Sequence, residues 1–488
     1  MIEAYAVADV RAAEEAAMAG LPEGELMARA SRGLAAVVAA RLEERQATRV
    51  VGLVGAGNNG GDALYALAHL ARRGFAAAAV SSPKAHSGGL AAARDAGVEL
   101  LETGSGWRDA LSAADVVLDG IYGIGGRPGL SEEAATWVVE IPDQAWVVAV
   151  DLPSGADPSG ETEVRDAVFA DETVTFGVAK PVHLMPGTER AVGRLTVVDI
   201  GLDVEAYRPV VERLTFDDVA RLWPVPGPSS DKYSRGVVGI VAGSPTYPGA
   251  AVMSVLGALN AGPGMVRYVG PSEVQALVHA AAPEAVTALG RVQAWVCGSG
   301  FEPESDAPGV AEQKQHVEDA LSSDLPAVVD AGGLEMIERR QAPTLLTPHA
   351  GELARLLNRL EAGPNGEAVT RDQITAAPVA HARAAAERTG CTLLLKGFHT
   401  LVVSPDPSRP IRVQADAPAW LATAGAGDIL GGLLGTLLAA GLDPLDAGAL
   451  GALVHGVAAD HANPGGPVRI TDVARAIPGT VADLLRYA

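Results

Sequence analysis

The residues best suited to chemistry in the first half of the chain lie in one glycine-rich run. It follows the apolar segment 50–54, precedes a segment of helical spacing, and reads Val54-Gly55-Ala56-Gly57-Asn58-Asn59-Gly60-Gly61-Asp62. A strand, a glycine turn and a helix start together form an anion cradle, because glycine lets the backbone come close and the first N–H groups of a helix are free. The amides and the carboxylate of this turn exceed what packing a helix on a sheet requires.

The same run matches the dinucleotide-binding pattern G-x-G-x-x-G at Gly55, Gly57 and Gly60, but that match alone is weak. In NAD-dependent dehydrogenases an acidic residue at the end of the next strand holds the ribose. The next expected strand, 76–80, ends without a carboxylate in Ser81-Ser82-Pro83. The sequence therefore argues against an ordinary dehydrogenase site.

Two further polar clusters follow expected strands in the first half. Asp119 ends the strand at 116–118 and leads into a glycine-rich loop, and Asp151 ends the strand at 146–150 and is followed closely by Ser154. The carboxyl ends of parallel strands meet at one edge of a sheet. We therefore expect the three clusters to share one site.

In the second half the decisive run is Gly425-Ala426-Gly427-Asp428, which opens a long apolar helix. The first turn of a helix offers free N–H groups to a transferring phosphoryl group, and an aspartate there can accept the proton of an attacking hydroxyl. The simpler interpretation is a helix cap, since aspartate favours the first turn of any helix. The two glycines before the carboxylate favour a functional interpretation.

Other runs at strand ends in the second half are less specific. Lys396 begins a run through Thr400 that suits a diphosphate, or forms only a β-turn with a surface lysine. His349 either caps the following helix or binds substrate. Gly300 and Asp330 end two further strands, and no Cys or His spacing indicates a metal site.

Composition limits the classes of partner. The chain has 488 residues and a net charge of −22, which argues against nucleic acid and anionic membranes, because both need a basic face. Its two cysteines, Cys297 and Cys391, lie in apolar runs and indicate buried thiols in a reducing compartment. The N-terminus lacks a signal-like core, and the apolar helix 429–442 is too short to span a bilayer. We expect a cytoplasmic protein.

The elements that position these residues alternate between strand and helix. Two alanine-rich helices, 7–20 and 25–45, precede the first strand, and the βαβ rhythm predicts a doubly wound α/β sheet in each half. A proline- and serine-rich stretch separates the halves. We expect a first domain at 1–213, a linker at 214–230 and a second domain at 231–488.

Together these motifs resemble those of the bifunctional NAD(P)H-hydrate repair enzymes, which fuse an NAD(P)HX epimerase to an ADP-dependent (S)-NAD(P)H-hydrate dehydratase. The resemblance covers nearly the whole chain. It implies a Rossmann-like N-terminal domain and a ribokinase-like C-terminal domain. The substrates it implies are the hydrated cofactors NADHX and NADPHX, and alanine-rich helices favour a homo-oligomer.

In the epimerase half the resemblance implies a potassium ion held by Asn59, Asp119 and Ser154, whose oxygen atoms suit a hard cation. Asp151 would do acid/base work at C6 of the damaged nicotinamide ring. Besides Asp151, the residues implied to bind the substrate are Asn58, Asn59, Gly60, Gly61, Asp62, Gly123, Ile124, Gly125, Gly126, Arg127, Pro128 and Gly129.

In the dehydratase half the resemblance implies that Asp428 and His349 face the hydrate, with Ala250 or Ala251 and Gly300 lining the pocket. Asp428 would activate the ring hydroxyl toward a nucleotide phosphate, and the phosphate ester would then be eliminated to regenerate NAD(P)H. The residues implied to bind ADP, accompanied by Mg²⁺, are Lys396, Gly397, Phe398, His399, Thr400 and Gly427.

The chain departs from the family pattern at several positions, which leaves the detailed shape of the dehydratase pocket open. These are Ala63, Ser299, Phe301, Glu302, Gly332 and Ala426. An alternative interpretation keeps the same Asp428 for a kinase of a small alcohol, joined to a Rossmann-like module that only binds. The polar set of Asn59, Asp119, Asp151 and Ser154 speaks against a module without catalysis.

Overall fold

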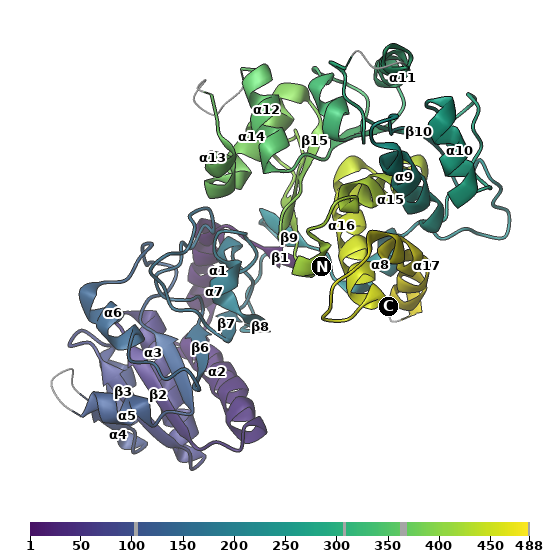
Figure 1. Cartoon of the computed structure of the whole chain (residues 1–488). Coiled ribbons are helices and arrows are strands. Elements are labelled where there is room, and N and C mark those ends of the chain that lie inside the picture. The colour runs from purple at the N-terminus through teal and green to yellow at the C-terminus, as the bar shows by residue number, and fades with distance from the viewer. Residues whose placement is uncertain (102–105, 306–308, 362–367, 487–488) are drawn as a thin grey trace. The chain divides into compact units, whose positions relative to one another are not determined.

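The computed structural model describes residues 1–101, 106–305, 309–361 and 368–486 (Figure 1). By its internal contacts the chain forms two compact units, one of residues Glu3–Val211 and one of Met1–Ile2 with Glu212–Ala488. Each unit contains one sheet with helices on both faces. The predicted α/β fold class is confirmed.

The N-terminal unit is built on a parallel sheet of seven strands with the order β4-β3-β2-β5-β6-β7-β8. The order reverses between β2 and β5, as in Rossmann-type sheets, where ligands bind outside the carboxyl ends at the reversal. The strands are β2 (Arg49–Val54), β3 (Ala76–Ser81), β4 (Glu99–Leu101), β5 (Val116–Gly120), β6 (Trp146–Val150), β7 (Glu172–Phe176) and β8 (Arg194–Val198).

Apolar side chains hold helices against both faces of this sheet. Leu34, Val38 and Leu67 pack on one face, and Trp107, Leu111 and Trp137 on the other. Strands buried on both faces need such near-continuous apolar runs. The helices of this unit are α1 (Val7–Gly20), α2 (Glu25–Glu44), α3 (Asn58–Arg72), α4 (Ser87–Asp95), α5 (Trp107–Ser112), α6 (Glu132–Val138), the 3₁₀ turn η1 (Pro181–His183) and α7 (Glu189–Val192).

Strands β10 to β17 of the C-terminal unit belong to a mixed sheet of ten strands, with the order β1-β9-β17-β16-β15-β14-β13-β12-β10-β11. Strands β10 to β15 are parallel, and β16 and β17 extend them as an antiparallel ribbon. The strands are β1 (Ile2–Ala4), β9 (Val211–Arg213), β10 (Val237–Val241), β11 (Met265–Tyr268), β12 (Ala294–Cys297), β13 (Ala327–Val329), β14 (Thr344–Leu346), β15 (Thr392–Leu395), β16 (Thr400–Val403) and β17 (Ile411–Gln414).

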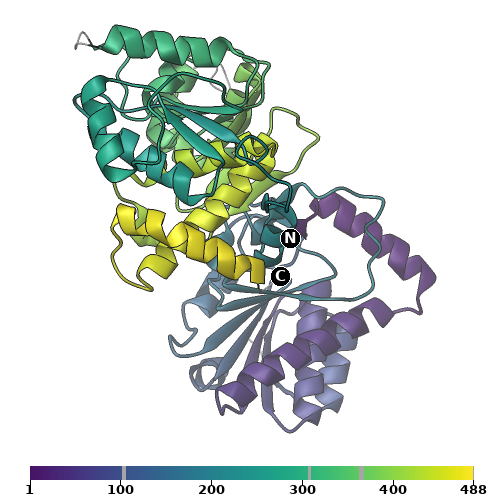
Figure 2. The same ribbon diagram turned by 90° about the vertical axis from the view of Figure 1, so that its right-hand side faces the viewer.

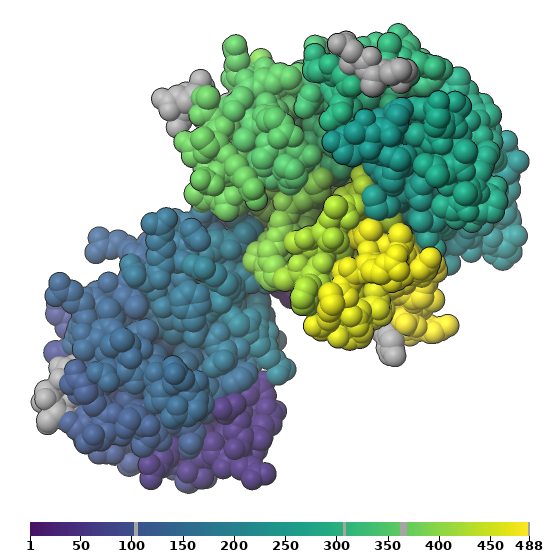
Figure 3. All heavy atoms as spheres, in the orientation of Figure 1, coloured from purple at the N-terminus to yellow at the C-terminus, as the bar shows by residue number. Residues whose placement is uncertain are grey.

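One large apolar core joins α8, α9, α15, α16 and α17 to this sheet, and a smaller core lies under α11. Figure 2 shows α16 and α17 side by side, and in Figure 3 their atoms pack against the neighbouring segments of the same unit. The helices are α8 (Phe216–Leu222), α9 (Pro248–Asn260), α10 (Ser272–Ala281), α11 (Val310–Ser322), η2 (Ala331–Glu335), α12 (Ala350–Arg359), α13 (Arg371–Ala376), α14 (Pro378–Thr389), η3 (Ala419–Leu421), α15 (Ala426–Ala439), α16 (Pro444–Ala462) and α17 (Ile470–Arg486).

The segment expected to be a linker contains helix α8. Its Val219, together with Leu214 and Trp223, lies in the large core of the C-terminal unit. The domain limits 1–213, 214–230 and 231–488 stay a prediction. Within the described ranges, no helix combines the length and apolarity needed to cross a bilayer.

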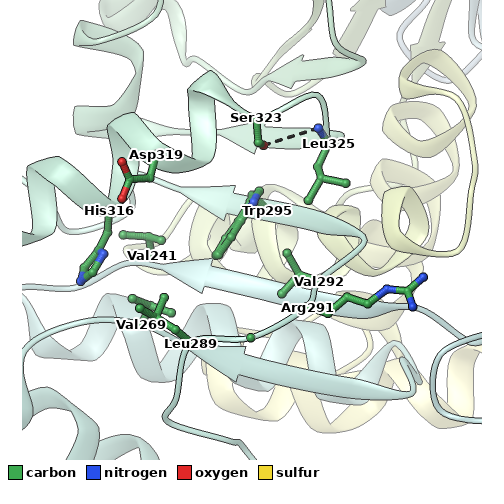
Figure 4. A pocket seen from close by; sticks show the side chains of 11 residues that line it. Val241, Val269, Leu289, Arg291, Val292, Trp295, His316, Asp319, Ser323 and Leu325 are labelled. Carbon is green, nitrogen blue, oxygen red and sulfur yellow. Dashed lines mark hydrogen bonds between the residues drawn. The ribbon is translucent and has the colours of Figure 1, made fainter.

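A cavity of about 320 Å³ lies beside α11 in the C-terminal unit (Figure 4). Trp295 of β12 forms part of its largely apolar wall, and His316 and Asp319 come from α11. None of its described lining residues belongs to the predicted sites.

Helices α9 and α15 approach each other at glycines. A methyl group on Gly432 would lie 2.0 Å from the carbonyl oxygen of Ser254, and one on Gly257 would lie 2.2 Å from the carbonyl oxygen of Ile429. Both distances are to backbone, which cannot rotate away. This close packing fixes the start of α15, where Asp428 lies.

We expect Gly432→Ala to lower the free energy of unfolding by about 1–3 kcal/mol, because a methyl group forced against backbone overpacks the core. The matched control is Gly431→Ala in the same helix, where the nearest atom to the added methyl is 3.7 Å away. The measurement is thermal melting of both variants. Equal melting temperatures would contradict the close approach of α9 and α15.

Candidate active sites

The glycine turn between β2 and α3 is tightly constrained by backbone. A methyl group on Gly55 would lie 1.9 Å from the carbonyl oxygen of Ile121, and one on Gly60 would lie 2.3 Å from that of Gly55. Gly57 has a φ of 92°, which strains other residue types. The turn therefore sets Asn59 against the loop after β5.

Asn59, Asp119 and Ser154 come together around the backbone of Tyr122. The side-chain amide of Asn59 donates to the Tyr122 carbonyl at 2.8 Å. The Ser154 hydroxyl donates to Asp119 at 2.6 Å and accepts from the Tyr122 N–H at 2.8 Å, and the Ser154 N–H also donates to Asp119, at 2.7 Å. Burial raises the pKa of Asp119 to about 6, although the hydrogen bonds from Ser154 oppose the shift.

Asp151 lies in a separate buried network at the ends of β6 and β7. The ammonium of Lys180 donates to its Oδ1 at 2.5 Å, and the hydroxyl of Thr175 donates to the same oxygen at 2.9 Å. Burial is the largest single influence and opposes ionisation, but the charge and hydrogen bond of Lys180, with smaller contributions from other neighbours, together outweigh it and hold the pKa of Asp151 below its usual value. Asp151 is thus an ionised carboxylate in a water-poor place.

The backbone of Asp151 is also held, at a φ of 66°. The Nδ1 atom of His183 accepts a hydrogen bond from the backbone N–H of Lys180 at 3.0 Å. The ring hydrogen is therefore on Nε2, which donates to the carbonyl of Asp151 at 2.8 Å. Burial lowers the pKa of His183 to about 4, which keeps the ring neutral. His183 therefore orients Asp151 without adding a charge.

The charges of this network affect the pKa values of Asp62 and Glu14. Burial, and then the negative charge of Asp151, raises the pKa of Asp62 well above its usual value. Burial also raises the pKa of Glu14, which interacts with Lys180 and Asp151. From the same helix α1, Arg11 donates to the carbonyl of Ile124 at 3.0 Å in the predicted loop Gly123–Gly129.

Some predicted residues of this half lie at the edge of the site. Asn58 and Arg127 are exposed, as are Gly125 and Pro128. The loop they flank is closed by backbone hydrogen bonds from Gly126 to Gly123 and from Gly129 to Gly155. The loop Gly123–Gly129 is therefore partly exposed and held by backbone hydrogen bonds.

In the C-terminal unit Lys396 is the centre of the polar cluster. Its ammonium donates to Asp330 at 2.6 Å and lies 3.7 Å from Glu352. Burial lowers the pKa of Lys396, but the two carboxylates outweigh it and the pKa is raised. A methyl group on Gly427 would lie 3.2 Å from that ammonium, so a side chain at this position would crowd it.

Asp428 lies in the first turn of α15, next to this cluster. Burial, and then the negative charge of Asp330, raises the pKa of Asp428 to about 6. The charge of Lys396 opposes the shift without cancelling it. Near neutral pH Asp428 can therefore exist as a carboxylate that readily takes up a proton.

His349 caps helix α12. Its Nδ1 accepts from the Glu352 N–H at 3.1 Å, and Glu352 accepts the His349 N–H at 2.8 Å. The rest of the ring is exposed, so capping leaves one face free. The helix-cap interpretation is thus realised, and the binding role stays a prediction.

The remaining predicted residues line two edges of this site. Gly300 approaches Ala250 so closely that a methyl group on it would lie 2.6 Å from the Ala250 side chain, and Ala251 similarly faces Gly243. On the hairpin after Lys396 and Gly397, Phe398 is exposed and packs edge-on against His399, and Thr400 begins β16.

Sequence reasoning missed four residues as site members. Lys180 and Asp330 both follow strands, so the strand-end rule that selected Asp151 contained the signal for them. Glu352 lay in a motif chosen for His349. Glu14, on helix α1, carried no signal, because nothing in its helical pattern indicates which face meets the sheet edge.

Comparisons with known proteins also distinguish an N-terminal and a C-terminal part of the chain. Residues 238–478 match a family described as NAD(P)H-hydrate dehydratase, and residues 23–182 match the family of YjeF-related protein N-termini. The chain is 43% identical over 470 residues to the bifunctional NAD(P)H-hydrate repair enzyme Nnr of Mycobacterium tuberculosis, covering 91% of each chain. With the Mycobacterium leprae enzyme it shares 42% over 482 residues, covering 94% of each.

The chain belongs to the family of bifunctional NAD(P)H-hydrate repair enzymes. It is therefore an NAD(P)HX epimerase and an NAD(P)H-hydrate dehydratase in one polypeptide.

Solved structures also resemble parts of this repair enzyme. An ADP/ATP-dependent NAD(P)H-hydrate dehydratase from Bacillus subtilis, co-crystallised with ATP and Mg²⁺, covers 56% of this chain and 99% of its own, with 24% identity and a TM-score of 0.48. A ribokinase-like superfamily protein from Enterococcus faecalis covers 57% of this chain and 98% of its own, with 20% identity and a TM-score of 0.49.

The ion pair of Lys396 and Asp330 in the repair enzyme predicts a loss of stability when its cation is removed. We expect Lys396→Met to cost about 3–5 kcal/mol at neutral pH, because it leaves the buried Asp330 carboxylate without its cation.

The measurement is chemical denaturation of wild type and variant at neutral pH. Arg475→Met is the matched control, since it removes an exposed ion pair with Asp472 that is worth little. A loss for Lys396→Met no larger than that for Arg475→Met would contradict the importance of the pair.

Proposed function

We propose that Asp428 is the base of the dehydratase reaction. It would take the proton of the C6 hydroxyl of the (S)-hydrate as that oxygen attacks the terminal phosphate of the nucleotide. The observation that carries this proposal is its place in the first turn of α15, beside the Lys396 ammonium. A ring hydroxyl leaves poorly and its phosphate ester leaves well, so elimination would then return NAD(P)H.

Lys396 and the helix start would hold the phosphates of the nucleotide. A lysine and free backbone N–H groups match the charge that develops on a transferring phosphoryl group. We propose ADP as this nucleotide, held also by Gly397, Phe398, His399, Thr400 and Gly427. The hydrated ring would bind near His349, Ala250, Ala251 and Gly300.

Magnesium would enter with the nucleotide. Among the described residues, no group of three His, Cys, Asp or Glu side chains is arranged to hold a metal ion, and Mg²⁺ commonly relies on substrate phosphates for its ligands. Bound there, it would neutralise charge on the phosphates. The chain itself would supply the base and the lysine.

The variant that tests this role is Asp428→Asn. We expect it to lower kcat of dehydration by at least about 100-fold, because the amide cannot accept a proton. Epimerisation by the same chain should be unchanged, which also shows that the variant is folded. In the wild type kcat should fall below about pH 6, the pKa of Asp428.

The measurement is the return of reduced-nicotinamide absorbance when hydrated NADH and ADP are mixed with the full chain. A kinase of a small alcohol would instead consume ATP only when its own alcohol is present. Full dehydration by Asp428→Asn would refute the proposed base.

In the epimerase half we propose that Asn59, Asp119 and Ser154 hold a potassium ion. Amide, carboxylate and hydroxyl oxygens suit a hard cation, and their convergence around Tyr122 supports a shared site. The ion would orient the oxygens of the substrate. Asp151 would do the acid/base work, with the loops Asn58–Asp62 and Gly123–Gly129 binding the dinucleotide.

Replacing potassium in the buffer tests this site. We expect epimerisation to fall when K⁺ is exchanged for Li⁺, which is too small for this set of ligands, and to return with added K⁺. Asp119→Asn should weaken the dependence of epimerisation on K⁺. Dehydration by the same chain serves as the control. Epimerisation equal in both salts would count against a potassium ion.

The homo-oligomeric state and the cytoplasmic location stay predictions of the sequence.

A further inference from the structure

We propose that Asp62 is the general acid of the epimerase reaction and Asp151 its general base. Asp62 would protonate the hydroxyl that leaves C6, and Asp151 would take a proton from the water that adds to the other face. This inference rests on the proposed function of the same site. It assigns which carboxyl group does which task.

The first observation is the unpartnered oxygen of Asp62. Its Oδ1 is buried and makes no hydrogen bond to the described residues, although the side chain lies within the field of Asp151, Glu14 and Lys180. A buried carboxylate normally accepts several hydrogen bonds. An oxygen without a donor suits a carboxyl group that keeps its proton and presents it to a ligand.

The second observation is that the environment of Asp151 differs from that of Asp62. One of its oxygens accepts from both Lys180 and Thr175, which hold the carboxylate in its ionised form. The two carboxyl groups thus sit in one site with environments that favour different protonation states. Such pairs mark the acid and the base of a reaction.

Lys180 is not free to act as the acid. An ammonium has three hydrogens, and those of Lys180 point at Asp151 Oδ1, Thr175 Oγ1 and the carbonyl of Phe176, at 2.5, 2.8 and 3.3 Å. All three are engaged. Lys180 is therefore a positioning residue that acts through Asp151.

Glu14 is the competing acid, because its pKa is also raised by burial. Its side chain is half-buried, whereas Asp62 is 9% exposed. The other charged or titratable groups that face the pair are Arg11 from α1 and His183 after β7. His183 is neutral and directs its hydrogen at backbone, so it does not compete for the proton.

The proton and electron balance of the step is complete. The C6–O bond breaks as the N1 lone pair forms a C6=N1 double bond, and the hydroxyl leaves as water with the proton of Asp62. Water then adds to the opposite face of C6, the electrons of C6=N1 return to N1, and the released proton goes to Asp151. Asp62 has then lost its proton and Asp151 has gained one, so the enzyme is ready for the reverse reaction. Proton exchange with solvent returns both carboxyl groups to their starting states.

The test uses the full chain with purified (R)-NADHX. We expect Asp62→Asn to lower kcat of epimerisation by at least about 100-fold with KM within about threefold, the size of effect of a lost general acid. Dehydration of the (S)-hydrate by the same variant should be unchanged and reports folding. The matched control is Glu15→Gln, an exposed carboxyl group on α1.

A second readout follows the oxygen. In H₂¹⁸O the wild type should place one solvent oxygen on C6 per inversion, and in Asp62→Asn exchange and inversion should fall together. Lys180→Met should shift the acidic limb of kcat/KM to higher pH, because Asp151 loses its cation, whereas a purely structural role would leave that limb in place.

The assignment is overturned if Glu14→Gln loses 100-fold in kcat while Asp62→Asn keeps more than a tenth of the wild-type rate. Inversion without solvent oxygen would also overturn it, since the leaving group would then not be water. Normal epimerisation by both Asp62→Asn and Asp151→Asn would instead refute the proposed site as a whole.

Discussion

Both active sites depend on a lysine that neutralises a buried aspartate beyond the carboxyl ends of parallel strands. Lys180 holds Asp151 in the N-terminal unit, and Lys396 holds Asp330 in the C-terminal unit. Neither charge would be tolerated there alone, since desolvation of a single ion costs several kcal/mol. The pairing lets each sheet edge keep charge where water is scarce, and electrostatic interactions in such places are strong.

Each unit also carries a second aspartate that no lysine neutralises. Asp62 and Asp428 both lie near the start of a helix entered through glycines, and both have a raised pKa with burial as its main cause. Close packing at Gly55 and Gly432 fixes these helix starts. Each site thus contains one carboxylate paired with a lysine and a second carboxyl group whose pKa is raised, an arrangement that suits acid/base chemistry.

Most of the fold could be predicted because its signals are local. The apolar runs and helical spacings lie close to β2, β6, α1 and α15 as observed, and the glycine turns lie at the edge that strand order implies. The helix in 216–222 was missed because prolines and serines near it indicated a linker. The pairing of Lys180 with Asp151 depends on which strands become neighbours in the sheet. The sequence alone does not show that these two residues lie close together in space.

Burial affects the two unpaired aspartates in the same direction but serves their proposed tasks differently. An acid must keep its proton until the leaving group departs, so burial of Asp62 without a donor favours its task. A base must lose its proton first, so burial opposes the task of Asp428. The nearby ammonium of Lys396 is one of the groups that oppose the shift, and the resulting pKa of about 6 is low enough for a carboxylate to predominate near neutral pH. The same glycine-led helix start can therefore serve an acid or a base, depending on how strongly its surroundings oppose the effect of burial.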